Sequence, residues 1–210
     1  MRNLSFRNVA GALSLLVGLG AIGGVFYTQS SRQIPATLEN PNVKTLEIAR
    51  ADLERNLSDS QQQLSAELKD VEANFDLPQH ATFSSDYSFL EIRDQLEQIE
   101  AQMQVDSSTK AKFEPELVWY EPGYFKSDAL VQWQCAWLKE AVIAREANDN
   151  IALEAALAQL ESFKQREEIA MFPDYDVFFN ENVAPIRRGD TAPAREFINS
   201  GFSCVEQNQL

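Results

Sequence analysis

The stretch WQCAWLKEAVIAREANDNIALEAALAQL, residues 133–160, decides the fold. Its apolar side chains recur every three or four residues, which predicts amphipathic helices over 127–147 and 150–170. Residues 148–150, NDN, form a tight connector between them. Two helices joined by so short a link form an antiparallel hairpin. The side chains expected to be apolar and core-facing are Leu130, Trp133, Cys135, Trp137, Leu138 and Ala141 in the first helix, and Leu153, Leu157, Leu160 and Phe163 in the second.

Two further helices are predicted on the N-terminal side of this hairpin. Residues 42–76 contain no Gly or Pro, follow the helix-start signal Asn40-Pro41, and predict one long helix of roughly 50 Å. Its heptad pattern is not sustained, so a stalk, a short coiled coil and a helix packed across the domain are all open alternatives. Residues 85–105 predict a second helix with a single apolar stripe. That stripe consists of Phe89, Ile92, Leu96, Ile99 and Met103.

A long irregular loop is predicted between the second helix and the hairpin. It covers residues 106–128, where Pro115, Pro122 and Gly123 interrupt any regular structure. Its aromatic side chains are too numerous for all of them to be exposed. The aromatic segment 113–137 is therefore a candidate surface for a ligand or a partner, with core packing as the alternative for the same side chains. The candidate residues are Trp119, Tyr120, Tyr124, Trp133 and Trp137.

The C-terminal part is also predicted to be helical. A short helix follows Pro173, is weakened by Pro185 and ends at Gly189. Asp190 or Thr191 caps a last helix. No run of residues alternates as a strand would, so the fold class is all-α.

An uncharged apolar run precedes all of these elements. Residues 9–27 contain no charged side chain, and as a helix they would extend roughly 28 Å, close to the thickness of a bilayer core. Arg2 and Arg7 precede the run and no acid occurs before Glu39, which favours a cytoplasmic N-terminus. An uncleaved membrane anchor is the preferred interpretation, and a cleaved secretion signal is the alternative. Gly20 and Gly24 form a small-xxx-small pair that would suit packing of two membrane helices.

The sequence therefore divides into an anchor and an outer part. The predicted divisions are a cytoplasmic tail (1–7), a transmembrane anchor (8–28), a linker (29–41), the long helix (42–76) and an extracytoplasmic helical domain (77–210). The protein is thus expected in the cell membrane, with a single pass and the C-terminal domain outside.

Charge and cysteine content are interpreted in the light of that topology. After residue 28 the chain has 16 bases against 32 acids, so it repels nucleic acid, and no nucleic-acid partner is expected. Cys135 and Cys204 are the only cysteines, and an even pair outside the cytoplasm predicts a disulfide. The alternative is two buried free thiols.

The chain lacks the residue sets of common catalytic sites. His80 is the only histidine, no serine lies in a Gly-x-Ser-x-Gly elbow, and no zinc motif or phosphate loop occurs. Paired carboxylates alone can hydrolyse a glycosidic bond, but no spacing selects a pair here. No enzymatic activity and no cofactor are therefore predicted.

Residues 127–204 resemble a pattern in uncharacterised, membrane-anchored exported proteins of actinobacteria. The resemblance is carried by Trp133, Cys135 and Trp137 on a helix with a hairpin partner, followed by the final Cys204. It implies a disulfide-bonded extracytoplasmic helical domain and no assigned activity. The predicted function is a structural or protein-interaction module of the cell envelope, with a protein partner or a second copy as candidate partners. A domain that binds cell wall or a small ligand through segment 113–137 is the alternative.

Overall fold

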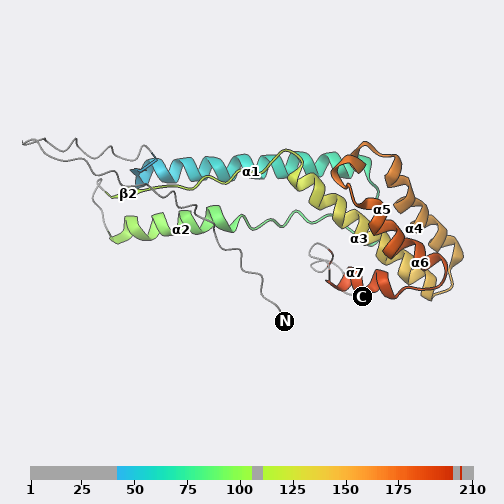
Figure 1. The fold of residues 1–210 in the computed structure, drawn as a ribbon. Coiled ribbons are helices and arrows are strands. Elements are labelled where there is room, and N and C mark those ends of the chain that lie inside the picture. The colour runs from blue at the N-terminus through green and yellow to red at the C-terminus, as the bar shows by residue number, and fades with distance from the viewer. Residues whose placement is uncertain (1–41, 106–110, 201–203, 205–210) are drawn as a thin grey trace, which may run out of the picture. The chain divides into compact units, whose positions relative to one another are not determined.

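The computed structural model describes residues 42–105, 111–200 and Cys204, and it confirms the all-helical fold class (Figure 1). The predicted anchor 8–28, with Gly20 and Gly24, lies outside the described residues. None of the described helices has the length and apolar character needed to cross a bilayer. In chain order the elements are β1 (Lys44–Thr45), α1 (Leu46–Asn74), α2 (Leu90–Val105), β2 (Lys112–Phe113), α3 (Tyr124–Glu146), α4 (Asn150–Ser162), the 3₁₀ turns Phe163–Gln165 and Glu167–Met171, α5 (Tyr175–Phe178), the π turn Phe179–Val183, α6 (Ala184–Arg187) and α7 (Ala192–Ser200).

The long helix α1 begins later than the Asn40-Pro41 signal predicts. Thr45 caps it, because its side chain accepts a hydrogen bond from the backbone N–H of Ile48 at 3.5 Å. Thr45 also belongs to β1, which pairs antiparallel with β2, a two-stranded ladder that the sequence did not predict. One face of α1 is buried along its whole length, so it packs against the other helices rather than extending alone. The buried residues are Leu46, Ala49, Leu53, Asn56, Ser60, Leu64, Leu68 and Val71.

Three hydrophobic clusters lie along α1, the smallest formed by Leu64 with Phe89 and Phe125. Towards its N-terminal end, Leu46 and Leu53 pack with Ile92 and Ile99 of α2. Towards its C-terminal end, α1 joins the main core, which α3 and α4 dominate. The α2 stripe is as predicted from Ile92 onward, but the helix begins at Leu90 rather than at residue 85, because Phe89 adopts a left-handed φ of 49°.

The helical hairpin is present as the sequence predicts. Asn148 has a φ of 57°, and the Asp149 carboxylate accepts from the backbone N–H groups of Ile151 and Ala152 at 3.1 and 3.0 Å. The left-handed Asn148 follows the end of α3, and Asp149 caps the start of α4. The second helix ends at Ser162 rather than at residue 170, and 3₁₀ turns follow it.

Cys135 and Cys204 form the predicted disulfide. Both residues are buried, and their Cα atoms are 5.5 Å apart. The bond connects the chain beyond α7 to the middle of α3. A buried disulfide in a helical domain is typical of proteins that fold in an oxidising compartment.

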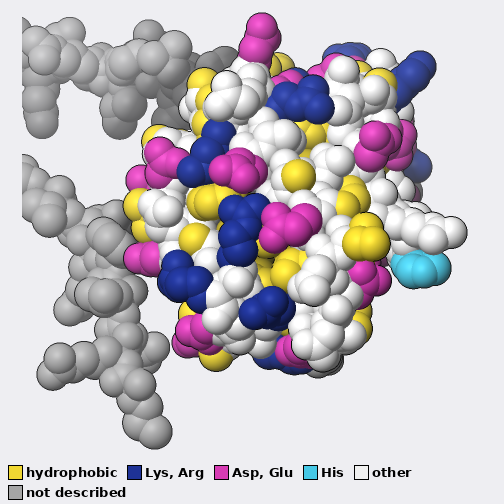
Figure 2. Space-filling view, turned by 90° about the vertical axis from the view of Figure 1, so that its right-hand side faces the viewer, with side chains coloured by type: hydrophobic (Ala, Val, Ile, Leu, Met, Phe, Trp, Pro, Cys, Tyr) yellow, Lys and Arg dark blue, Asp and Glu magenta, His cyan; other side chains and the backbone are white. Residues whose placement is uncertain are grey.

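The C-terminal helices add ion pairs to the surface of the hairpin. Arg195 of α7 binds Glu146 at the end of α3, with its Nε 2.8 Å from one carboxylate oxygen, and Arg187 of α6 lies 2.9 Å from Glu154 of α4. Figure 2 shows the face on the right of Figure 1, where Lys and Arg side chains are interspersed with Asp and Glu. These two ion pairs neutralise Arg187 and Arg195 locally.

Candidate functional site

An open groove lies between α2 and the segment that leads into α3. It has a volume of about 1270 Å³. Residues of the stretches 87–98 and 113–124 line it, together with Ser127 and Met171. Of the predicted surface residues, Trp119, Tyr120 and Tyr124 line this groove. We call residues 114–121, which run along it without a turn, the wall segment.

Trp133 and Trp137 lie elsewhere. Both indole N–H groups donate to the backbone carbonyl of Asp76, each at 2.9 Å. Trp133 is fully buried in the main core, where its ring packs edge-on against Phe75. These two tryptophans therefore fix the chain that follows α1 against α3, and they do not join the other three aromatic residues.

Amide side chains of α1 and α2 hold the wall segment, and one of them, Gln63 of α1, donates to the carbonyl of Glu121 at 3.0 Å. Gln95 of α2 makes two hydrogen bonds to the backbone of Glu116, donating to its carbonyl and accepting from its N–H, both at 2.8 Å. Asn56 of α1 binds the backbone of Val118 in the same way, at 2.8 and 2.9 Å. Each of these last two amides replaces the pair of bonds that a neighbouring β-strand would supply. The segment is thus fixed although it contains no regular secondary structure.

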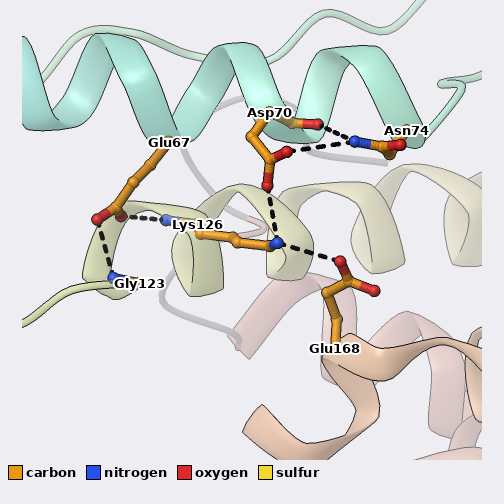
Figure 3. Close-up of polar contacts among 6 residues, drawn as sticks. All are labelled: Glu67, Asp70, Asn74, Gly123, Lys126 and Glu168. Carbon is orange, nitrogen blue, oxygen red and sulfur yellow. Dashed lines mark hydrogen bonds and ion pairs between the residues drawn. The ribbon is translucent and has the colours of Figure 1, made fainter.

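Glu67 fixes the end of the wall segment and starts α3 (Figure 3). Its carboxylate accepts from the backbone N–H of Gly123 at 2.8 Å and from that of Lys126 at 2.9 Å. It therefore caps the helix from a neighbouring element, where the exposed N–H groups and the helix dipole favour a negative charge. The predicted start of this helix at residue 127 is wrong, because α3 already begins at Tyr124 behind Gly123, whose φ is 89°.

A lysine on the first turn of α3 adds ion pairs to the junction between α1 and the start of α3. The ammonium of Lys126 lies 2.8 Å from Asp70 of α1 and 3.0 Å from Glu168 in a 3₁₀ turn (Figure 3). The hydrogen bond to Asp70, together with the contact to Glu168, raises the pKa of Lys126. The junction therefore joins three elements that are far apart in the sequence, and it supports the end of the groove.

Aromatic rings form the floor where the wall segment meets α3. Phe125 is almost fully buried, and its ring lies 4.9 Å from that of Tyr87 and 4.8 Å from that of Tyr120. Phe89 packs on the same ring. Burial, followed by a hydrogen bond with Tyr124, raises the pKa of Tyr87, and burial raises that of Tyr120. Both phenols stay neutral well above physiological pH, and this end of the groove is lined by aromatic rings.

One large aromatic side chain of the groove, that of Trp119, is exposed to solvent. Trp119 is 83% exposed and Leu117 is 40% exposed, although amide bonds hold the backbone of Glu116 and Val118, which flank Leu117, and Val118 directly precedes Trp119. An exposed Trp on a fixed backbone offers a large contact area with little loss of conformational entropy.

The polar lining of the groove is acidic. Its charged members are Glu91, Asp94, Glu114, Glu116 and Glu121, all of which are exposed, and no Lys, Arg or His lines it. The shielded carboxylic acid that glycoside hydrolysis needs is not among them. Among the described residues no cluster of His, Cys, Asp or Glu has the arrangement of a metal site. The groove therefore presents exposed carboxylates beside aromatic side chains.

Comparisons with known proteins provide no relative for this chain. No protein-family model matches it, and no significant match was found among curated proteins or solved structures.

Proposed function

We propose that this protein is a single-pass, membrane-anchored interaction module of the cell envelope, whose helical domain lies outside the cytoplasm and binds a partner protein in the groove. The uncharged run 9–27, preceded by Arg2 and Arg7, supports the anchor and its orientation. The buried Cys135–Cys204 disulfide supports an oxidising compartment for the domain.

The observation that carries the binding role is the state of Trp119. It projects into solvent from a backbone that Gln95 and Asn56 hold in place. An exposed Trp next to a fixed stretch of backbone beside an open groove is typical of the anchors that dominate protein interfaces. A purely structural segment would instead turn so large a ring into the nearby aromatic floor.

The membrane topology is tested on intact cells that express the full chain. Alkaline extraction of the membranes is expected to leave the protein in the pellet, and protease added from outside is expected to remove the helical domain. A cleaved signal would instead release the domain on extraction, which would retain the outside location but overturn the anchor. Protein dissolved inside the cell with two thiols that alkylate without reductant would overturn the whole proposal.

The binding role is tested by photocrosslinking in the same cells. A photoreactive phenylalanine replaces Leu117 in the groove, and the matched control replaces Ile151 of α4, which is 87% exposed and lies outside the groove lining. We expect one recurrent adduct from position 117 that is absent from position 151 and is lost in a Trp119→Ala background. Equal adducts at both positions, or none at 117, would contradict a binding groove.

A further inference from the structure

The wall segment has a backbone edge at Leu117 and Trp119 that is unpaired among the described residues. The bonds from Gln95 and Asn56 go to Glu116 and Val118, which are alternate residues. In an extended chain the backbone N–H and C=O groups of the intervening residues point to the opposite edge. The backbone groups of Leu117 and Trp119 form no hydrogen bond with any described residue.

That edge belongs to residues that line the groove. Leu117 and Trp119 both contribute to the groove lining, and both side chains are exposed. An unpaired edge of this kind is a template on which another extended chain adds as a strand, with main-chain hydrogen bonds for affinity and side-chain contacts for specificity. The amide bonds on the other edge keep the template straight before any partner arrives.

The charges around the edge select the occupant. Glu91 and Asp94 belong to α2, and Glu116 and Glu121 belong to the wall segment. No Lys, Arg or His among the lining residues offsets these four negative charges. None of these four carboxylates forms an ion pair with another described residue. A Lys or Arg side chain would meet these carboxylates and the face of the Trp119 ring together. Anionic chains would be repelled.

We infer that the groove binds an extended, basic segment of a partner protein, which adds as a strand to the free edge at Leu117 and Trp119 with its Lys or Arg side chains between the carboxylates. This inference rests on the proposed binding role and specifies its ligand. It predicts that affinity depends on the peptide backbone and on positive charge at the same time.

The experiment uses the full chain purified in detergent and a fluorescent decapeptide of alternating Lys and Val. Fluorescence anisotropy is expected to show saturable binding that weakens as salt rises. A peptide of alternating Glu and Val tests the charge, and a Lys/Val peptide with N-methyl groups on alternate residues tests the main-chain bonds. Both are expected to bind at least about tenfold more weakly.

Two pairs of variants locate the site on the protein. Leu117→Pro removes the free N–H without removing any hydrogen bond seen in the structure, and Leu117→Ala removes only the side chain. We expect Leu117→Pro to lose at least about tenfold in affinity and Leu117→Ala to lose much less. Neutralising Glu91 and Asp94 together is expected to weaken binding, whereas Glu97→Gln, which does not line the groove, is not. Circular dichroism checks that each variant is folded.

Several results would overturn the inference. These are equal binding of the N-methylated or the Glu/Val peptide, unchanged affinity in folded Leu117→Pro, or no saturable binding of the Lys/Val peptide below about 1 mM. Saturable binding of chitohexaose with no peptide binding would identify a sugar site instead. If photocrosslinking from position 117 still succeeds in any of these cases, the interaction module stands and only its ligand is wrong. If both experiments fail, the proposed function fails as well.

Discussion

Replacing Glu67 by Gln should destabilise the protein, although the change keeps the size of the side chain. The carboxylate accepts three hydrogen bonds at 2.8 to 2.9 Å, from the backbone N–H groups of Gly123 and Lys126 and from the side-chain amide of Gln63. A glutamine retains one acceptor oxygen but turns an NH₂ group towards a donor. It also removes the negative charge at the start of α3.

The size of the effect follows from these losses. Loss of a helix cap costs about 0.5 to 2 kcal/mol, and a favourable charge at a helix N-terminus contributes about 0.3 to 1 kcal/mol at a partly exposed position. We therefore expect a decrease of about 1 to 2 kcal/mol in the free energy of unfolding. For a folded unit of this size that corresponds to a fall in Tm of about 2 to 8 °C.

The assay is thermal and urea unfolding of the full chain in detergent, followed by tryptophan fluorescence. Glu72→Gln is the matched control, because it removes the same charge from an exposed position of the same helix. In a chain of net charge −14, any gain from reduced self-repulsion appears in both variants. If Glu67→Gln unfolds within about 0.5 kcal/mol of Glu72→Gln, the carboxylate does not cap α3 and the reasoning is refuted.

Three further predictions concern other elements. Replacing Cys135 and Cys204 by Ser opens a loop with a sequence separation of 69 and should cost about 4 kcal/mol in the chain-entropy model; non-reducing mass spectrometry should find the two linked in the native chain, and quantitative alkylation without reductant would contradict this. Asn56→Ala leaves the backbone groups of its partner on the wall segment unpaired and should cost about 1 to 3 kcal/mol by urea unfolding; an unchanged midpoint would show that this amide does not hold the segment. The hydrogen bond from Arg195 lowers the pKa of Glu146, so this pair stabilises the fold above the unfolded pKa of about 4.3, and the stabilisation is lost as pH falls through the lower folded value; the Tm advantage over Glu146→Gln should therefore shrink below about pH 4, and a constant advantage would speak against the pair.

The sequence predicted the elements whose causes are local. The hairpin follows from apolar periodicity in α3 and α4, and its connector is set by Asp149, which caps the helix that it precedes. The α2 stripe and the short C-terminal helices have the same kind of cause. The disulfide was predictable because only two cysteines are present.

The start of α3 could not be predicted in this way. Its cap is Glu67, which lies 56 positions before Gly123 in the chain, so no local signal marks it. The start of α1 was placed too early for a similar reason, since Thr45 pairs in a strand with a residue of β2 and also caps the helix. Long-range partners override local start signals at both points.

The sequence predicted only part of the groove. Trp119, Tyr120 and Tyr124 were recognised as a possible surface, whereas Trp133 and Trp137 were grouped with them because they are close in sequence. The amide bonds from Asn56 and Gln95 were missed altogether. Asn56 carried a signal, because it is a polar residue on the otherwise mostly apolar face of α1, and a buried amide must find partners.

Residue-resolved amide hydrogen exchange of the full chain, with and without the Lys/Val decapeptide, tests the central claim most directly. In the free chain we expect slow exchange at Glu116 and Val118, whose N–H groups are bonded to side-chain amides, and fast exchange at Leu117 and Trp119. Bound peptide should slow the second pair and leave the first unchanged. Protection of all four amides in the free chain, or no change at Leu117 and Trp119 with saturating peptide, would contradict an open edge that receives a strand.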